Sequence, residues 1–366
     1  MSAAAVFRPE ATSGTARVGR VKTARGSFAT PCFMPVGTRG TVRTLSAPDL
    51  ELLGVEVALA NAYHLMLRPG AETIAGLGGL HRFTGWSGHL LTDSGGYQVF
   101  SLAPDVDDDG VTFHSSYDGS VHRLTPEGAV AVQAAIGADI QMVLDVCPPL
   151  PAPPEVLRLA VERTAAWAGR ARRAHVREGQ ALFGIVQGGV DEGLRRESAA
   201  RTAALEFDGY GIGGFSVGEP RDQMLPALAA TLAELPPDRP RYLMGVGDPV
   251  SMLEAVALGV DMFDCVLPTR LARHGTALTA TGRLNVRSGV VAGEAEPLET
   301  GCGCPVCTRW SRAYVRHLLT VGEPSAGRLL TLHNLAWTLA LLGRIRQAVV
   351  EGRLGRLRDE LAAAWP

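Results

Sequence analysis

The sequence predicts an α/β protein whose core is a (β/α)8 barrel, the TIM-barrel architecture, followed by a helical appendage. Three observations predict this fold: eight short apolar runs, helix-compatible sequence between them, and a length of 366 residues, which suits one barrel with insertions. The runs are nearly continuous in apolar residues, as expected for parallel strands that are buried on both faces. They span residues 31–37, 55–61, 89–95, 139–145, 182–188, 210–215, 241–247 and 261–267.

Segments between these runs carry helix signals. Residues 153–170 begin with two prolines and continue in helix formers, and residues 249–259 have the length and composition of a second helix. Strands that alternate with helices imply a parallel sheet, and eight repeats imply its closure into a barrel. After the eighth run, residues 335–345 and 357–365 are predicted to form the helices of the appendage.

Composition and charge limit the class of protein. The chain is 46% hydrophobic, which is ample for a large core, yet it contains no run of about 20 apolar residues of the kind that spans a membrane. Its first residues lack a basic region followed by an apolar one, so no signal peptide is expected and the predicted compartment is the cytoplasm. A net charge of −2 disfavours indiscriminate binding of nucleic acid.

Four potential metal ligands lie near the C-terminus, in the pattern C-x-C-x2-C-x25-H: Cys302, Cys304, Cys307 and His333. Three thiolates and one imidazole saturate a tetrahedral zinc ion and leave no position for substrate, so the predicted cofactor is one structural Zn²⁺. The alternative is a set of buried free cysteines. We expect a single domain over residues 1–366, with a zinc-binding subdomain at about residues 290–345. The remaining cysteines are expected to be ordinary core thiols: Cys32, Cys147 and Cys265.

Arginines form local groups on a chain that has only one lysine. One group, at positions i, i+3 and i+7, is predicted to share a helix face: Arg309, Arg312 and Arg316. A second group follows the eighth apolar run: Arg270, Arg273 and His274. Such groups can bind phosphates, and the alternative is a solvated helix face.

Polar side chains, and glycines with exposed backbone N–H groups, recur where the predicted strands end, and in a barrel these positions meet at the C-terminal mouth. They are Asp93, Asp145, Gln187, Gly213, Gly214, Gly245 and Asp264. Any one of them alone would be explained as an ordinary residue of a turn. Together they suit a double displacement at a sugar carbon, in which one carboxylate attacks and another moves protons. A further carboxylate with an amide suits the edge of a guanine, and Tyr97 and Met244 could enclose the flat base, although other reactions remain open.

Several long motifs resemble the signatures of the tRNA-guanine transglycosylases, from about residue 32 to the C-terminal helices. They are T-D-S-G-G-Y-Q-V-F-S-L (92–102), G-I-V-Q-G-G (184–189), R-Y-L-M-G-V-G (241–247), F-D-C-V-L-P-T-R-L-A-R-H-G (263–275), W-S-R-A-Y (310–314) and the Cys3His set. This resemblance implies a zinc-containing (β/α)8 barrel. It also implies replacement of the wobble guanine in tRNAs with GUN anticodons (Asp, Asn, His and Tyr) by a 7-deazaguanine, in queuosine biosynthesis.

The resemblance assigns roles by motif. It makes Asp264 the nucleophile on the ribose C1′ and Asp93 the general acid/base. Base recognition falls to Asp145, Gln187, Gly214, Phe215 and Glu219, with Tyr97 and Met244 stacking on the base. The anticodon stem-loop is expected to meet Arg270, Arg273 and Arg312. A homodimer is also implied. No nucleotide or redox cofactor is implied, because the covalent ester conserves the energy of the glycosidic bond between the two half-reactions.

The sequence departs from the family pattern in three places, and the first two lie where the 7-substituent of the incoming base is expected. Val146 stands where an acidic residue is usual, Phe215 and Ser216 replace a Leu-Ala pair, and Asp248 replaces a common lysine. Cys147 together with Val217 is similar to bacterial enzymes that use 7-aminomethyl-7-deazaguanine, and queuine is the alternative base. The aminomethyl group is cationic, so we expect the Phe215 carbonyl and the Glu219 carboxylate to bind it.

Two other classes of protein remain as alternatives. A retaining glycoside hydrolase is also a barrel with paired carboxylates, but it needs neither zinc nor arginine groups. A non-catalytic RNA-binding partner subunit would resemble the enzyme and lack its catalytic aspartates, both of which are present here as Asp93 and Asp264.

Overall fold

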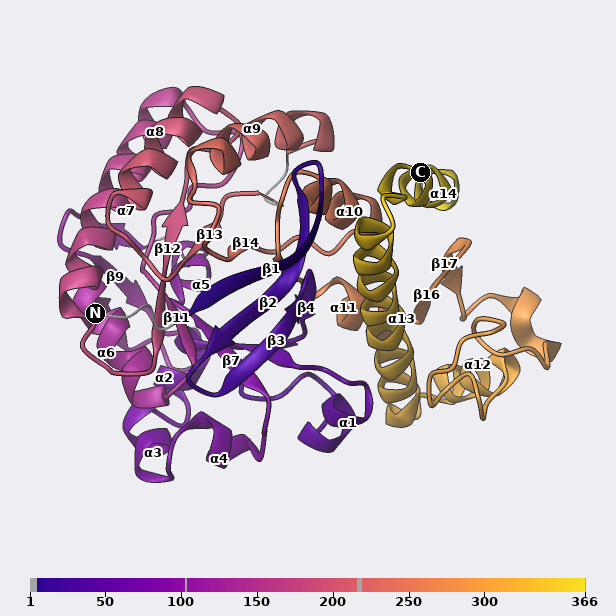
Figure 1. The fold of residues 1–366 in the computed structure, drawn as a ribbon. Helices are drawn as coiled ribbons and strands as arrows, with labels where there is room; N and C mark the ends of the chain where they lie inside the picture. The colour runs from indigo at the N-terminus through magenta and orange to yellow at the C-terminus, as the bar shows by residue number, and fades with distance from the viewer. Residues whose placement is uncertain (1–4, 103, 216–218, 366) are drawn as a thin grey trace.

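A parallel β-barrel forms the centre of the protein in the computed structural model, which describes residues 5–102, 104–215 and 219–365 (Figure 1). Its strands pair in the order β4-β15-β14-β13-β12-β11-β7-β6-β5. Every pairing in this sheet is parallel. The strands are β4 (Cys32–Met34), β5 (Val36–Gly37), β6 (Val57–Asn61), β7 (His89–Asp93), β11 (Ile140–Met142), β12 (Ala181–Val186), β13 (Gly209–Ile212), β14 (Arg241–Leu243) and β15 (Met262–Asp264).

One interrupted strand closes the barrel. β4 pairs with β15 and β5 pairs with β6, and only Pro35 separates the two short strands. Proline has no N–H for the ladder, but its carbonyl still accepts a hydrogen bond of 3.0 Å from the backbone N–H of Leu59. β4 and β5 thus act as one strand of an eight-position barrel, which confirms the predicted (β/α)8 architecture.

Helices surround the barrel, and several begin where the sequence supplies a cap. The side chains of Thr125, Asp191 and Asp248 accept hydrogen bonds from backbone N–H groups in the first turns of α6, α8 and α10. Asp248, in place of the family's common lysine, therefore has a local structural role. The helices up to the eighth strand are α1 (Ala47–Leu52), α2 (Ala62–Leu67), α3 (Ala71–Gly76), α4 (Leu80–Thr84), α5 (Gly96–Phe100), α6 (Pro126–Ile136), α7 (Pro154–Ala174), α8 (Glu192–Ala203), α9 (Arg221–Glu234) and α10 (Pro249–Ala257).

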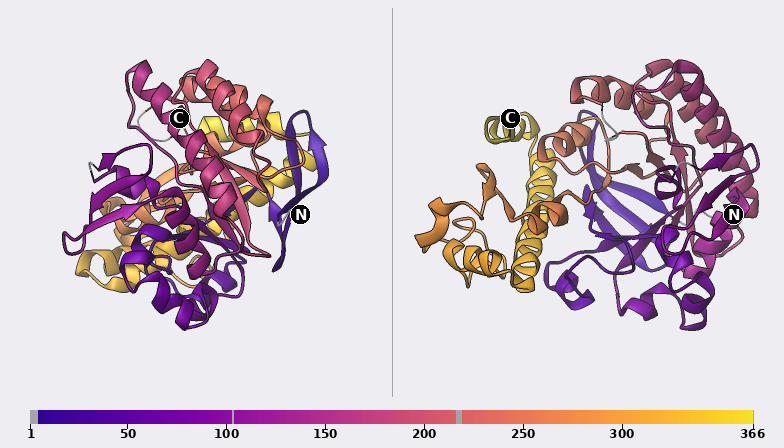
Figure 2. Two further views of the ribbon diagram at one scale, coloured as in Figure 1. Left: turned by 90° about the vertical axis from the view of Figure 1, so that its left-hand side faces the viewer. Right: turned by 180° about the vertical axis from the view of Figure 1, so that it is seen from behind.

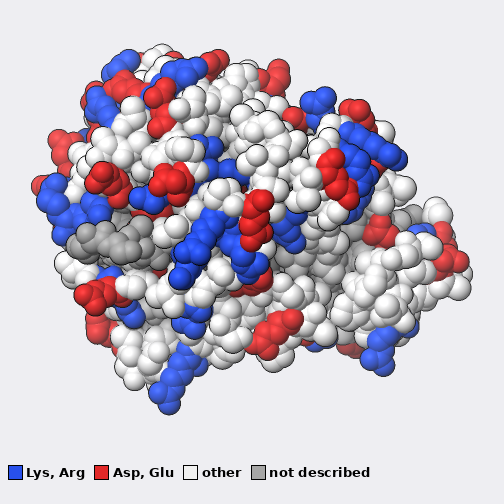
Figure 3. All heavy atoms as spheres, viewed as in Figure 1, with Lys and Arg blue, Asp and Glu red and all other residues white. Residues whose placement is uncertain are grey.

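A three-stranded antiparallel sheet covers the N-terminal end of the barrel, as Figures 1 and 2 show. It consists of β1 (Val6–Ser13), β2 (Ala16–Thr23) and β3 (Gly26–Thr30). Arg17 reaches the buried Asp261, just before β15, and Arg25 reaches Asp139, just before β11. Basic and acidic side chains are interspersed on this face (Figure 3). Because the β1–β3 sheet covers this end, the open end of the barrel is the opposite one.

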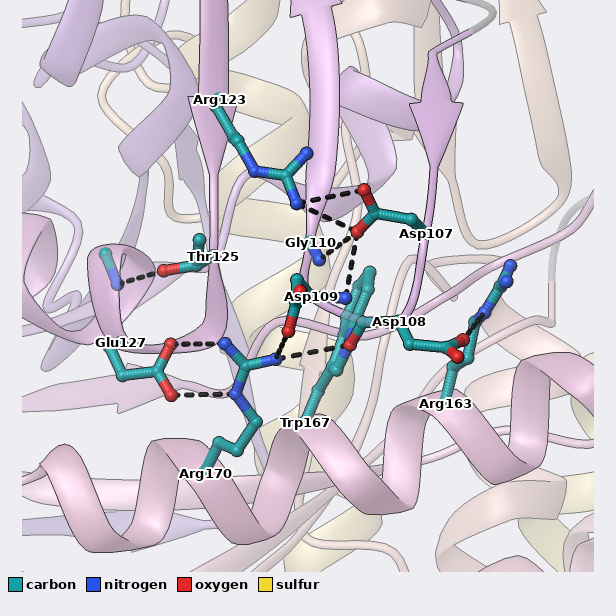
Figure 4. A network of polar contacts seen from close by, with 11 residues as sticks. Asp107, Asp108, Asp109, Gly110, Arg123, Thr125, Glu127, Arg163, Trp167 and Arg170 are labelled. Atoms are coloured by element: carbon teal, nitrogen blue, oxygen red, sulfur yellow. Dashed lines mark hydrogen bonds and ion pairs between the residues drawn. The ribbon is translucent and has the colours of Figure 1, made fainter.

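A second small sheet is inserted after α5, between the third and fourth barrel strands. It consists of β8 (Asp105–Val106), β9 (Val111–His114) and β10 (Val121–Leu124). Arginines bind the acidic turn between β8 and β9, as Figure 4 shows: Arg123 pairs with Asp107, and Arg163 of α7 pairs with Asp108. The indole of Trp167 donates to the Asp108 carbonyl, so α7 anchors the insertion to the barrel.

The chain after the eighth strand builds a second lobe, which α13 joins to the barrel (Figure 1). Its elements are α11 (Leu267–Arg273), β16 (Thr276–Thr279), β17 (Gly282–Asn285), the 3-10 helix η1 (Gly289–Gly293), α12 (Arg312–Val321), α13 (Pro324–Val350) and α14 (Leu354–Ala364). Arg309 precedes α12, so the predicted helix face with three arginines is wrong at its first member. In the described part of the chain, no helix combines the length and apolar character needed to cross a membrane.

Candidate active site

Three carboxylates meet at the C-terminal mouth of the barrel. Asp93 is the last residue of β7, Asp264 is the last residue of β15, and Asp145 follows β11. β11 is shorter than predicted and ends three residues before its carboxylate. Because these strands are parallel in one barrel, their C-terminal ends bring the three groups around one volume. The negative charges of Asp264 and Asp145 accordingly add to burial in raising the pKa of Asp93.

Asp93 is held by the adjacent strand and the helix that follows it. Its carboxylate accepts hydrogen bonds from the Asn61 side-chain amide (2.7 Å), the Ala62 N–H (2.9 Å) and the Gly95 N–H (3.2 Å). Burial nevertheless raises the pKa of Asp93 to about 7, helped by the neighbouring carboxylates. A group with this pKa can both donate and accept a proton near neutral pH.

Asp264 has a different environment. Both of its hydrogen bonds fall on Oδ1, from the Tyr242 hydroxyl (2.6 Å) and the Gly245 N–H (2.7 Å). Burial raises the pKa of Asp264 although these two donors oppose the shift. Among the described residues nothing donates to Oδ2, which leaves one carboxylate oxygen available to react.

Asp145 and Gln187 form a buried pair, in which the amide nitrogen of Gln187 donates to Asp145 at 2.6 Å. Burial raises the pKa of Asp145 to about 6. Glycines let the next strand approach this pair closely. A Cβ atom on Gly213 would lie 2.7 Å from the Gln187 amide nitrogen, and one on Gly214 would lie 2.4 Å from its oxygen. Gly214 also has a φ of +72°, so only glycine fits there without strain.

Tyr97 and Met244 lie on opposite sides of the mouth. Tyr97 is on α5, which follows the third barrel position, and Met244 follows β14 at the seventh. The Tyr97 ring is 61% exposed and the Met244 side chain is partly buried. An aromatic face and a thioether on opposite sides of a mouth lined by carboxylates can enclose a flat, polar-edged ring.

The inserted β8–β10 sheet supports the wall that holds Asp93. In its β9–β10 turn, Ser116 bonds to the Tyr63 hydroxyl and Tyr117 bonds to a ring nitrogen of His64, at 3.0 and 2.8 Å. Both partners belong to α2, whose first N–H donates to Asp93. The anchoring of the insertion on α7 therefore extends, contact by contact, to the carboxylate.

The structure changes the interpretation of the residues expected near the 7-substituent of the base. Val146 is buried in an apolar cluster that includes Trp167, so its replacement of an acid takes no carboxylate out of the mouth. The Phe215 ring is also buried and lies over the Arg195 guanidinium. Glu219 is partly exposed, and its charge acts on Arg195. Ser216 and Val217 lie outside the described residues.

Cys147 and Cys265 are not the isolated core thiols that the sequence predicted. Cys147 contacts the Gln187 side chain and the Gly214 backbone, and Asp145 and Arg195 act on its charge. Burial raises its pKa to about 12, so the group remains a thiol. Cys265 follows Asp264 directly and accepts a hydrogen bond from the Leu267 N–H.

An arginine group borders the mouth on α11. Arg270 is exposed, Arg273 is partly buried, and the positive charges of Arg43 and Arg270 help to lower the pKa of Arg273. Within the described residues none of these three forms an ion pair with a carboxylate. Arg312 differs, because it pairs with Glu294 at 2.7 Å and donates to a backbone carbonyl inside the second lobe.

The Cys3His set forms a compact cluster. The ligand atoms of its four residues lie within 4.8 Å of one another: Cys302, Cys304, Cys307 and His333. The Nε2 atom of His333 bonds to the Leu278 carbonyl at 2.8 Å, which leaves Nδ1 facing the sulfur atoms, 3.3 Å from that of Cys307. Three thiols, an imidazole and a fixed tautomer fit a structural metal site of the zinc type.

Sequence reasoning missed the partners that hold the carboxylates of the barrel mouth. Asn61 ends the second predicted strand, and its position at a strand end was a usable signal. Tyr242 lies within a run that reads as an ordinary buried strand, and Arg195 lies in a helix whose amphipathic pattern is weak. Arg43 is separated from α11 by more than 200 residues, so only the fold brings it there.

The fold and the site define a barrel enzyme with paired carboxylates and a C-terminal Cys3His cluster that fits a structural metal site. A model of the family described as queuine tRNA-ribosyltransferase matches residues 12–366. The chain is similar to proteins of that name from Moorella thermoacetica (52% identity over 95% of this chain and 93% of the relative) and Desulforudis audaxviator (53%, over 95% of each). A relative from Thermus thermophilus is 50% identical over 97% of this chain and 93% of its own length.

The chain therefore belongs to the queuine tRNA-ribosyltransferase family. It is an enzyme of the transferase class with the number EC 2.4.2.29.

The raised carboxylate pKa values generate a stability prediction. The pKa of Asp264 is higher in the folded protein than in the unfolded chain, so the folded state holds this proton more tightly. Stability therefore falls as the pH rises from the unfolded pKa to the folded pKa. Asp264→Asn keeps an oxygen for Tyr242 and Gly245 and removes this loss. The melting temperature of Asp264→Asn relative to wild type should therefore rise as the pH increases above the ordinary pKa of an aspartate, about 4.

Differential scanning fluorimetry at a series of pH values measures this difference, in which groups that do not interact with Asp264 cancel. Asp222→Asn, on an exposed carboxylate in the first turn of α9, controls for the replacement itself. A difference that shrank with rising pH would contradict a buried, destabilised Asp264 carboxylate.

Proposed function

We propose that this protein exchanges the wobble guanine of tRNAs with GUN anticodons (Asp, Asn, His and Tyr) for 7-aminomethyl-7-deazaguanine, in queuosine biosynthesis. The family membership supports transglycosylation of tRNA. The observation that carries the proposal is the joint position of Asp93 and Asp264 at one mouth, beside the Asp145–Gln187 pair.

In the first half-reaction, Oδ2 of Asp264 attacks the ribose C1′ while the bond from C1′ to N9 of guanine breaks. The electron pair goes to N9, which takes a proton from Asp93. Tyr242 and Gly245 hold Oδ1 and thereby fix the attacking carboxylate. Asp93 is suited to this proton transfer because its pKa of about 7 leaves it partly protonated at neutral pH.

In the second half-reaction, the incoming base loses its N9 proton to Asp93. N9 then attacks C1′, and the Asp264 carboxylate leaves. The ester conserves the energy of the glycosidic bond between the two steps, so the reaction needs no nucleotide or redox cofactor.

The Asp145–Gln187 pair suits the polar edge of the base. Asp145 accepts the N1 and N2 hydrogens, and the Gln187 amide carries two hydrogens. One already binds Asp145, and the second can donate to O6. Tyr97 and Met244 then lie against the two faces of the ring, and Gly214 leaves room for it.

For the base itself, the aminomethyl group requires acceptors, and we assign the Phe215 carbonyl and Glu219 to this role. Queuine is the alternative base. The Phe215 ring is turned into the core, which is compatible with a carbonyl directed to the mouth.

The anticodon loop is proposed to lie on the group formed by Arg43, Arg270 and Arg273, with its target base extruded into the mouth, as single-stranded loops permit. Arg312 is engaged with Glu294, so we place the RNA surface on α11 instead. tRNA as substrate implies action in the cytoplasm. A homodimer is proposed as the assembly, and the exposed Tyr314 ring, stacked on Trp310, is an aromatic surface of the kind that interfaces use.

The metal is proposed to be one Zn²⁺ per chain, held by Cys302, Cys304, Cys307 and Nδ1 of His333. Its contribution is structural, because four protein ligands leave no open position. The adjacent Asn334 binds Leu278 of β16 and the Pro268 carbonyl of α11, so α13 connects this site to the arginine group.

The zinc assignment predicts that Cys304→Ser loses metal and folded yield together, because metal binding in such sites contributes directly to folding. Metal content by mass spectrometry and soluble yield measure the two effects. Cys32→Ser, at a thiol outside the cluster, is the control for metal content. A folded, metal-free and active Cys304→Ser protein would contradict a structural role.

The catalytic assignment predicts that Asp264→Asn abolishes incorporation of labelled guanine into unmodified tRNA, since an amide is a poor nucleophile. Asp93→Asn should reduce incorporation by about 10²-fold or more through lost proton transfer. On a denaturing gel, a covalent complex with tRNA should be absent for Asp264→Asn. Its appearance there would show that another residue attacks C1′.

The base assignment predicts that wild type uses 7-aminomethyl-7-deazaguanine in preference to queuine. Glu219→Gln should raise the apparent KM for the aminomethyl base by about tenfold and spare guanine, because it loses one charge-assisted hydrogen bond. Titration of the three bases in parallel measures both effects. An equal effect on all bases, or a preference for queuine, would remove the aminomethyl assignment.

The RNA surface predicts a steep fall of tRNA affinity with salt, because arginines displace condensed counterions. Arg270→Ala should weaken binding and reduce the log–log salt slope by about one, without changing which base is inserted. Arg358→Ala, on the distant α14, should leave the slope unchanged. An Arg270→Ala slope equal to that of wild type would place the RNA elsewhere.

A further inference from the structure

Arg195 is a fully buried arginine behind the base-reading residues, and the mechanism above does not use it. It lies in the first turns of α8, with none of its surface exposed, whereas its neighbour Arg196 is on the solvent side and pairs with Glu192 and Glu234. Removing a guanidinium from water is costly, and an apolar side chain would fill the same volume without that cost. The position therefore calls for a specific role.

The guanidinium clamps the backbone on both sides of Gln187. Its Nε donates to the Gly189 carbonyl at 2.7 Å, and one terminal nitrogen donates to the Val186 carbonyl at 3.2 Å. These two carbonyls lie on either side of Gln187, whose side-chain amide pairs with Asp145. Because the planar guanidinium has its donors in a fixed geometry, it holds the strand end and the following turn in one conformation.

The same group contacts the neighbouring turn after β13. The Phe215 ring lies over the guanidinium, 3.9 Å from its central carbon to the ring centre. The second terminal nitrogen would be 3.3 Å from a Cβ atom on Gly214, and it has no hydrogen-bond partner among the described residues. Arg195 thus joins the segment that carries Gln187 to the segment that carries Gly214 and Phe215.

The charge of Arg195 is balanced by its surroundings. Burial lowers its pKa to about 9, while the Glu219 carboxylate favours the charged form, so the group is a cation at neutral pH. Glu219 therefore acts on Arg195 from the same segment that is proposed to meet the 7-substituent of the base.

We propose that Arg195 is a positioning residue for base recognition, which fixes Gln187 and the Gly214–Phe215 turn relative to each other. The edge of the base that carries O6 and the edge that carries the 7-substituent are then read by one rigid unit. This inference rests on the proposed function, because it concerns the same base site, and it assigns Arg195 no contact with the reacting atoms.

The test compares Arg195→Met and Arg195→Lys with Arg196→Ala as a matched surface control. The apparent KM for guanine should rise at least about tenfold in Arg195→Met, because the reading groups lose their alignment. The value of kcat at saturating base should stay within about twofold of wild type, and the covalent tRNA complex should form normally, because Asp93 and Asp264 are held by other strands. Arg195→Lys should reverse only part of the rise in KM, since an ammonium cannot reproduce the planar set of N–H donors of the guanidinium.

Each outcome decides the question. A folded Arg195→Met protein with the wild-type KM, or with kcat and KM equally impaired, overturns the positioning role. Failure of both Arg195 variants to fold assigns the residue to stability alone and also overturns it. A wild-type protein that exchanges no base would overturn the proposed function first, so the two failures are distinguishable.

Discussion

Three carboxylates share one poorly solvated barrel mouth, and the rest of the site depends on how their repulsion is managed. Burial and mutual charge raise the pKa of Asp93 to about 7, and burial raises that of Asp145 to about 6. Three full negative charges at this spacing would be unfavourable, so the site tends to retain a proton near neutral pH. That retained proton is what an acid/base group at Asp93 needs.

The barrel manages this constraint with neighbouring strands. β6 and α2 supply two of the three donors to Asp93, and β14 and its following turn supply both donors to Asp264. Gln187, the residue after β12, supplies its side-chain amide to Asp145. In each pair the two strands are adjacent in the sheet. In a parallel barrel, adjacent strands end at the same end of the barrel. Each carboxylate is therefore oriented by donors from the strand beside it.

The sequence predicted much of this arrangement and could not predict the rest, for physical reasons. Buried parallel strands leave a continuous apolar signal, so all eight runs contain barrel strands, although the first is interrupted at Pro35. Motif matching located Asp93 and Asp264, whose positions at strand ends the structure confirms. The sequence could not predict that the Val146 side chain packs in an apolar cluster and not in the mouth. Alternate residues of a short extended segment point to opposite sides, and the sequence does not say which side faces the mouth. The engagement of Arg312 with Glu294 depends on a turn that has no sequence signal.

The position of His333 beside Asn334 has a consequence for thermodynamic linkage. One residue faces the metal cluster and bonds to the Leu278 carbonyl, and the next binds the N–H of the same Leu278 and the first turn of α11. If the cluster holds a metal ion, its occupancy and the placement of the arginine group are linked through one helix turn. Linkage of this kind is reciprocal, so a polyanion that bound α11 and favoured this placement of the helix would also strengthen the binding of that metal.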